Sequence, residues 1–222
     1  MIPPDDFIPV AETSGLINSL GDKVLETACL QLKLWHQAGH DQLVVSVNLS
    51  AIQFRQDDLI SKIHKTLETT GICAHHLELE ITESTIMDDI DTASSTMRAL
   101  HCSGIRLSID DFGTGYSSLS HLKRFPINTV KIDSSFIHDV TVDSDDAAIV
   151  SAIITMAHNM GLRVVAEGVE TKAHLAFLGS LGCDEVQGFL FSPPVPHYEA
   201  VKLIGEHIDT LLIPAADRQT AS

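Results

Sequence analysis

Six short β-rich runs alternate along this chain of 222 residues with longer amphipathic stretches, and that order leaves few folds open. The runs with strand character are residues 43–48, 77–82, 105–110, 129–133, 163–167 and 185–191. The clearest helical stretches between them are residues 16–38, 59–70, 91–102 and 146–160. Because strands separated by helices pair in parallel through right-handed crossovers, the order predicts a parallel α/β fold.

Within these runs, apolar and polar side chains alternate. In the second run Leu77, Leu79 and Ile81 oppose Glu78 and Glu80. A period of two places each set on one face of its strand. A half-solvated antiparallel sheet would give the same alternation, but the intervening helices favour a TIM-like β/α barrel. In such a barrel the apolar faces pack on helices and the polar faces line the interior.

Polar residues also gather toward the carboxyl ends of the runs. The residues concerned are Asn48, Glu80, Asp110, Asp111, Asp133, Glu167 and Gln187. Taken singly, a strand-end aspartate is more often a helix cap or a turn former than a ligand. Active sites of β/α barrels lie at the carboxyl ends of the strands, however, so the six polar ends together predict a site there.

The chemistry of these side chains points to hard metal ions. Carboxylates crowded at one barrel mouth repel each other unless cations separate them. Ligands that are all oxygen favour Mg²⁺ or Mn²⁺ over zinc. The adjacent Asp110 and Asp111 could serve two ions, and a pair of ions about 3.5–4 Å apart clamps the attacking and leaving oxygens of a phosphoryl displacement.

Charge and hydropathy exclude several other classes of protein. The formal net charge is −16, which disfavours a binder of nucleic-acid polymers, because such a protein needs basic surface. No apolar run approaches the roughly 18 residues of a membrane span. Residues 1–10 lack the basic and then apolar order of a signal peptide. We therefore expect a cytoplasmic protein, or a cytoplasmic part of a larger one.

The four cysteines are widely spaced, at Cys29, Cys73, Cys102 and Cys183. This spacing suggests neither a zinc site nor a disulfide framework. We expect reduced and mostly buried thiols.

The stretch DDFGTGYSSL at residues 110–119 resembles the long loop of the EAL family of cyclic-di-GMP phosphodiesterases. Five further motifs of that family occur in order: NLSAIQF at 48–54, ELEITES at 78–84, LKRFPINTVKID at 122–133, VVAEGVET at 164–171 and GCDEVQGFLFSPPVP at 182–196. The resemblance extends over nearly the whole chain. It implies an EAL domain over residues 1–212 and a flexible tail over 213–222.

The resemblance implies hydrolysis of one phosphodiester bond of cyclic-di-GMP, giving the linear dinucleotide. It also implies about six of the eight strands of a barrel, since a complete member has two more strands before this point. The second of those strands carries Glu-Ala-Leu and, shortly after it, an arginine. We expect weak or no activity of this chain by itself, unpaired strand edges, and a homodimer as a possible assembly. A non-catalytic cyclic-di-GMP-binding module and an inactive fragment are the alternatives.

The resemblance further implies a centre with two metal ions, Mg²⁺ or Mn²⁺. It assigns the ligands to five residues: Asn48, Glu80, Asp110, Asp111 and Glu167. Asp110 would bridge the two ions, with Asn48 and Glu80 on the first ion and Asp111 and Glu167 on the second.

Further roles follow from the same resemblance. Lys131 would contact the attacking water, and Gln187 would contact the catalytic cluster or the substrate phosphate. Asp133 and Glu170 would be supporting polar groups, and Glu83 would anchor the loop at residues 110–119.

Lys131 has two other interpretations. It could pair structurally with Asp133 on the same face of its strand. It could also form a Schiff base, which needs a depressed pKa. Surrounding carboxylates favour the protonated form of a lysine, so the Schiff base is the weaker of these interpretations.

Overall fold

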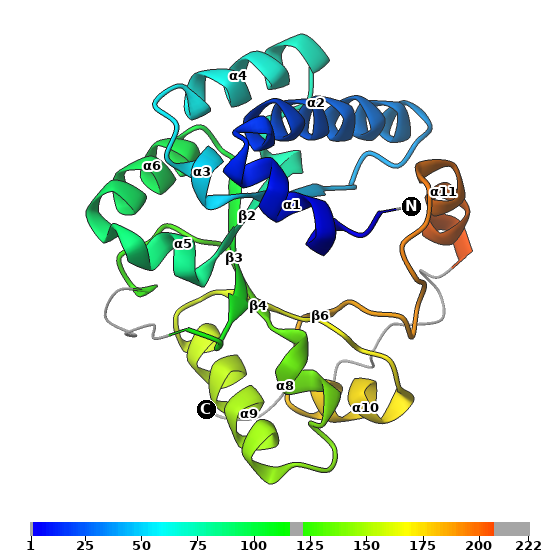
Figure 1. The fold of residues 1–222 in the computed structure, drawn as a ribbon. Helices are drawn as coiled ribbons and strands as arrows, with labels where there is room; N and C mark the ends of the chain where they lie inside the picture. Colours follow the sequence, from blue (N-terminus) through cyan, green and yellow to red (C-terminus); the bar gives the residue numbers. More distant parts are fainter. Residues whose placement is uncertain (1, 116–121, 207–222) are drawn as a thin grey trace, which may run out of the picture.

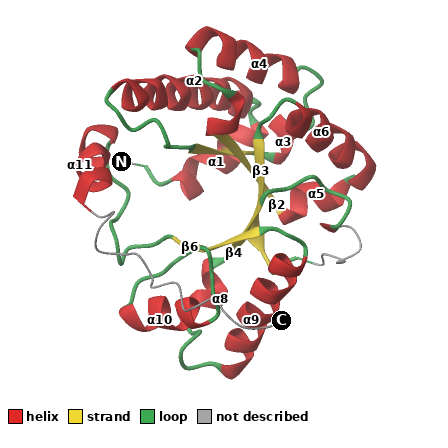
Figure 2. Cartoon of the chain, turned by 180° about the vertical axis from the view of Figure 1, so that it is seen from behind, coloured by secondary structure: helices red, strands yellow, loops and turns green. Residues whose placement is uncertain are grey.

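The computed structural model describes residues 2–115 and 122–206. The predicted tail at 213–222, the end of the predicted domain and part of the DDFGTGYSSL stretch lie outside these residues. The described residues form one curled, parallel sheet of six strands in the order β1-β2-β3-β4-β5-β6. Helices cover the outside of the sheet (Figures 1 and 2). The fold is an α/β, TIM-like barrel that does not close, as predicted.

Each of the six strands overlaps one of the six predicted runs. Their bounds are β1 Val45–Leu49, β2 Leu77–Thr82, β3 Arg106–Phe112, β4 Thr129–Ile132, β5 Arg163–Ala166 and β6 Glu185–Val186. The parallel register places Asn48 beside Glu80, and Lys131 beside Val165. In the described part of the chain β1 and β6 are the sheet edges, as the incomplete barrel requires.

The four predicted long helices are present to within a few residues. They are α2 Leu16–Gln37, α4 Leu59–Thr70, α6 Ile90–Cys102 and α9 Ser144–Asn159. The other helices are α1 Pro4–Thr13, α3 Ala51–Phe54, η1 Ala74–His76, α5 Glu83–Asp88, α8 Ser134–His138, α10 Lys172–Ser180 and α11 His197–Glu206. Within the described ranges, no helix combines the length and the apolar character needed to cross a membrane.

Helix α4 illustrates how the sequence forms the helices that pack on the outside of the sheet. Leu59, Ile63 and Leu67 recur every four residues, which places them on one face of a helix, and all three are buried. The helix ends at Gly71, whose φ of 75° permits a left-handed cap, and the Gly71 N–H donates to Leu67 O at 2.8 Å. The glycine thus ends the helix where the chain turns toward β2.

The hydrophobic core lies between the sheet and the helices. The apolar side chains of β2, Leu77, Leu79 and Ile81, are fully buried. The opposite face of β2 carries Glu78 and Glu80 into the interior of the curled sheet, where both are also buried. The predicted parity is therefore correct, and it produces an interior lined by polar groups.

Two strand ends differ from the prediction. Strand β3 continues past Asp110 to Phe112, with a register shift against β4 between Ile109 and Phe112, so the two aspartates lie within the strand. Strand β6 ends at Val186 instead of residue 191. It ends early because the chain turns onto Val169, which exchanges backbone hydrogen bonds with Gln187 and Leu190 at 3.0 Å.

The prediction of mostly buried cysteines was half wrong. All four thiols are free, as expected, but Cys73 and Cys102 are exposed while Cys29 and Cys183 are buried. Burial raises the pKa of Cys29 to about 11 and that of Cys183 to about 12, so both buried side chains are neutral thiols.

Candidate functional site

An ammonium group lies at the centre of the polar interior. The side chain of Lys131, on β4, extends between carboxylates from three other segments. Its Nζ lies 2.7 Å from Glu80 Oε2, 3.0 Å from Asp110 Oδ1 and 2.6 Å from Glu167 Oε1. The Lys131 side chain is only 7% exposed. Three carboxylates around one ammonium leave the cluster with an excess of negative charge.

Asn48 completes this cluster from the edge strand β1. With its amide nitrogen turned inward, the side chain donates to Asp110 Oδ2 at 3.1 Å and to Glu80 Oε2 at 3.2 Å. With its oxygen turned inward, it faces the same two carboxylates, an arrangement that is repulsive unless a cation lies between them. Hydrogen bonds from Asn48 therefore hold the cluster together in the first orientation, and the second orientation would require a bound cation.

Burial and neighbouring charges shift the titration of the cluster. Burial raises the pKa of Glu80 and of Glu167, and the Lys131 charge only partly opposes that rise. Burial lowers the pKa of Lys131, but the charge of Glu80 and the hydrogen bonds to Glu167 and Glu80 outweigh it, so the net shift is upward. Lys131 is therefore a protonated ammonium, which does not suit Schiff-base chemistry.

Asp111 has unusual backbone geometry. Its φ is +53°, and it is the one non-glycine residue with positive φ in the described part of the chain. It lies within the register shift of β3 against β4, where an irregular strand re-aims a side chain. Burial, together with the charges of Asp110, Asp133 and Glu167, raises the pKa of Asp111. Strain and crowded charge thus coincide at this residue.

The cluster borders a cavity of about 410 Å³ inside the open sheet. The cavity is lined by Gln42, Leu43, Val44, Ser46, Glu78, Glu80, Arg106, Lys131, Arg163, Val165, Glu185 and Gln187. The predicted site residue Gln187 therefore lies on the same cavity as Glu80 and Lys131. Arg163 pairs with Glu185 in this cavity, where these residues begin β5 and β6, at the end of the sheet opposite the carboxyl ends.

Two predicted supporting residues lie outside the cluster of contacts. Asp133 caps α8, where its Oδ1 accepts a hydrogen bond from Ser135 N at 2.9 Å. Glu170 is exposed and makes no hydrogen bond or ion pair with any described residue. Since Lys131 pairs with Glu80, Asp110 and Glu167, the interpretation that it pairs with Asp133 was wrong.

Glu83 lies beside the start of the loop that was predicted to depend on it. Its Oε2 accepts a hydrogen bond from Gly113 N at 3.0 Å, and its side chain is almost fully buried. A β-carbon on Gly115 would lie 2.5 Å from Glu83 Oε1, so a side chain there would displace the Glu83 carboxylate. The hydrogen bond from Gly113 to Glu83 is of the kind that an anchor for the start of this loop requires.

The donor set suits a hard divalent cation. It consists of carboxylate and amide oxygens, and the buried Asp110 Oδ1 has no hydrogen-bond partner even though Lys131 Nζ is 3.0 Å away. As placed, no three His, Cys, Asp or Glu side chains of the described residues are grouped to hold a metal ion. The reason is geometric, because the carboxylates converge on the Lys131 ammonium. Their oxygens would have to turn from that ammonium to an ion.

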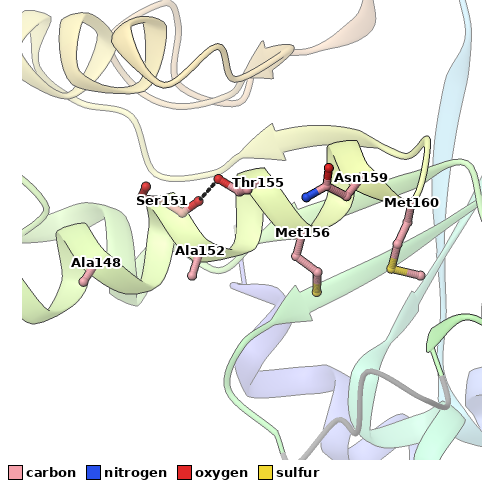
Figure 3. Close-up of a pocket in the computed structure, with 7 residues that line it drawn as sticks. All are labelled: Ala148, Ser151, Ala152, Thr155, Met156, Asn159 and Met160. Atoms are coloured by element: carbon pink, nitrogen blue, oxygen red, sulfur yellow. Dashed lines mark hydrogen bonds between the residues drawn. The ribbon is translucent and has the colours of Figure 1, made fainter.

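A larger groove, of about 740 Å³, runs along the outer face of α9 (Figure 3). It is lined by Ala148, Ser151, Ala152, Thr155, Met156, Asn159 and Met160. Ser151 and Thr155 are joined in Figure 3 by a hydrogen bond from Thr155 Oγ1 to Ser151 O at 2.9 Å. The groove has no charged lining, so the charged cluster around Lys131 is the better candidate for chemistry on a phosphate.

Sequence reasoning did not identify some residues that shape the site. The positive φ of Asp111 has no signal in a single sequence. Ser50 and Gln53, which follow Asn48, form a capping box that the S-x-x-Q spacing could have indicated. Arg106 and Arg163 lie on the cavity because they share the strand face of the predicted polar residues.

Comparison with known proteins identifies relatives for this arrangement. The sequence profile of the EAL domain matches residues 1–194. MucR of Pseudomonas aeruginosa, a bifunctional diguanylate cyclase and cyclic di-GMP phosphodiesterase, is 47% identical over 196 residues, covering 88% of this chain and 29% of MucR. NbdA of the same species, a cyclic di-GMP phosphodiesterase, is 46% identical over 88% of this chain and 25% of NbdA. The chain thus spans roughly a quarter of these relatives.

Solved structures agree with this result. The structure of the MucR phosphodiesterase in complex with c-di-GMP has a TM-score of 0.88 to this chain, at 47% identity, over 90% of this chain and 81% of that one. The EAL domain of DcpA from Mycobacterium smegmatis has a TM-score of 0.81 at 39% identity, over 85% of this chain and 84% of that one.

Proposed function

The chain belongs to the EAL domain family, and we propose that it binds cyclic-di-GMP and hydrolyses one phosphodiester bond to give the linear dinucleotide. The observation that carries this proposal is the Lys131 ammonium within 2.6–3.0 Å of Glu80, Asp110 and Glu167. Such a cluster at the carboxyl ends of barrel strands suits phosphoryl chemistry, provided that cations offset the carboxylates.

We assign the cations to two sites at the mouth of the barrel, with Mg²⁺ or Mn²⁺ as the ions. Asn48, Glu80 and Asp110 would hold the first ion, and Asp110, Asp111 and Glu167 the second. Bound there, the ions would polarise a phosphoryl oxygen and lower the pKa of a bound water.

The protein's own groups then position the reactants. Lys131 is protonated and so acts as a hydrogen-bond donor that holds the attacking oxygen in line, and it cannot serve as a general base in this state. Its ammonium also offsets the negative charge that accumulates on the phosphoryl oxygens. Gln187, on the same cavity, would donate an amide hydrogen to a phosphate oxygen.

Three residues would support this centre from outside it. Glu83 would hold the start of the loop after β3 through its bond to Gly113. Asp133 contributes negative charge near Asp111, as its effect on the pKa of Asp111 indicates. Glu170 would act only if substrate or cation brings it closer.

A second candidate function is cyclic-di-GMP binding without hydrolysis. The family's first metal takes a glutamate from a Glu-Ala-Leu tripeptide, and that tripeptide does not occur in these 222 residues. A site with one anionic ligand fewer binds its ion more weakly, so we propose a low turnover for the 222-residue chain. The open sheet of the described residues favours this candidate as well.

The deciding experiment incubates the 222-residue chain with cyclic-di-GMP and Mg²⁺ or Mn²⁺, and measures the linear dinucleotide by chromatography. Metal-dependent product that disappears on Lys131→Ala supports the phosphodiesterase. Retained binding of cyclic-di-GMP, measured by calorimetry, without product supports the binding module. Neither product nor binding contradicts both candidates.

A further inference from the structure

The position of Asn48 poses a structural problem. Asn48 lies near the end of β1, which is paired only with β2 in the described part of the chain. A strand with one neighbour lacks half of the backbone hydrogen bonds that fix a central strand. The segment that follows β1 must therefore help to hold Asn48 beside Glu80 and Asp110.

The segment that follows is the short helix α3, and its first turn is closed by side chains. Ser50 caps the helix: its Oγ accepts from Gln53 N at 3.3 Å. In return, Gln53 Oε1 accepts from Ser50 N at 3.3 Å and from Ser50 Oγ at 3.2 Å. Gln53 is only 5% exposed, so these bonds are shielded from water.

The other side of Gln53 is closed by α2. A β-carbon on Gly21 would overlap the Gln53 side-chain amide, so a side chain at residue 21 would displace that amide from its place against α2. Helix α2 also packs on α4 and on β1. Gln53 is therefore enclosed between a long, well-packed helix and the backbone two residues beyond Asn48.

We propose that Gln53, held between Ser50 and Gly21, is a positioning residue that fixes Asn48 at the carboxylate cluster on the open side of the sheet. This inference rests on the proposed function, in which Asn48 is a ligand of the first metal. A helix cap with no other role would stabilise α3 but would have no effect on the affinity for the ion.

The test measures Mn²⁺ binding to the 222-residue chain, by the electron paramagnetic resonance signal of free Mn²⁺, for wild type, Asn48→Ala, Gln53→Leu and Gly21→Ala. Both Gln53→Leu and Gly21→Ala should weaken the binding that Asn48→Ala weakens, by about 10-fold, as outer-shell changes commonly do. Gln56→Leu is the matched control, because Gln56 lies three residues away and its side chain contacts Lys62 instead. This control should bind Mn²⁺ like the wild type.

Ser50→Ala keeps the test usable if either larger change prevents folding, since it removes one hydroxyl and leaves the packing intact. It should weaken Mn²⁺ binding in the same direction. Wild-type affinity in Gln53→Leu and Ser50→Ala, with a lowered melting temperature and with Asn48→Ala impaired, would overturn this inference alone. A wild type that binds no Mn²⁺ would overturn the proposed metal site and this inference together.

Discussion

Lys131 holds together a set of groups that would otherwise repel one another. Its ammonium contacts three carboxylates within 3.0 Å, and all the side chains involved are largely shielded from water. Removing one partner of a buried charge cluster leaves the others uncompensated, which commonly costs about 3–5 kcal/mol. The lysine therefore has a structural effect that can be measured separately from catalysis.

The first prediction concerns Lys131→Met in chelating buffer. The free energy of unfolding in urea should fall by about 3–5 kcal/mol, because Glu80, Asp110 and Glu167 lose their counter-charge. Added Mn²⁺ should recover part of the loss. Lys123→Met, an exposed lysine, is the control and should change the value by less than about 0.5 kcal/mol. Equal losses in the two variants would contradict the structural role of Lys131.

The second prediction concerns Asp111→Asn, also in chelating buffer. Asparagine tolerates positive φ as aspartate does, so the backbone is unaffected. The pKa of Asp111 is raised in the folded state, so its protonated form is favoured. The stability that this gives is present below the unfolded value of 3.8 and is lost as the pH rises through the folded pKa.

Asp111→Asn should therefore match the wild type in stability below about pH 3.8 and exceed it at pH 7. Urea unfolding at several pH values measures the difference. Hydrolysis of cyclic-di-GMP, where detectable in the wild type, should be lost in this variant. A variant that is less stable than the wild type at pH 7 would show that the charged aspartate stabilises the fold.

The sequence predicted the identity of the clustered residues better than their conformation. Asn48, Glu80 and Asp110 could be placed at one end of the barrel because parity and strand ends are properties of single runs, and parity placed Lys131 on the interior face. The left-handed backbone of Asp111 could not be predicted, because it depends on how a strand end meets its neighbour, whereas the cap formed by Asp133 is the ordinary role of a strand-end aspartate.

At the scale of elements, the end of β6 is a tightly constrained junction. Gly188 follows Gln187 and lies directly on the backbone of Val169, which itself follows Glu167 by two residues. The same junction explains why β6 is shorter than predicted. The apolar run continues to residue 191, but the backbone hydrogen bonds turn to Val169.

The third prediction concerns Gly188→Ala. A β-carbon there would overlap the Val169 backbone, which cannot move as a flexible side chain does, so the free energy of unfolding should fall by about 1–3 kcal/mol. The strand ends that carry Glu167 and Gln187 should separate, so binding of cyclic-di-GMP should weaken as well.

Gly161→Ala is the control for this change. Gly161 has a φ of 73° and nothing within 4 Å of a β-carbon, so its replacement strains the backbone only. It should lower stability in thermal unfolding but leave binding unchanged. Weakened binding in both variants would mean that general destabilisation, and not this junction, is responsible.

At the scale of the whole molecule, the sheet has two free edges in the described residues, β1 and β6. Element order and strand parity were sufficient to predict a β/α barrel with a polar interior, and the family resemblance predicted that two strands are missing from it. The assembly they lead to could not be predicted from the residues, since unpaired edges attract many partners. The homodimer suggested by the resemblance therefore stays a prediction.

The fourth prediction is concentration-dependent self-association of the 222-residue chain, measured by size-exclusion chromatography with light scattering at micromolar concentrations. Ser46→Lys should reduce it, because a lysine placed on an edge strand opposes strand pairing. Ser46 is exposed on β1, where its side chain lies on the interior cavity that Glu80 and Lys131 also line. A monomer at every concentration would count against association through the edges and against the dimer.

The Lys131 ammonium also affects whether the chain can fold before it binds metal ions. A zinc finger cannot fold before its ion arrives, since the ion supplies the folding energy. Here Lys131 already occupies the place between the carboxylates, so synthesis and folding can be completed while divalent ions are scarce. Under the proposed function, loss of the ions would stop hydrolysis without unfolding the protein, and the folded chain would bind ions again when they return.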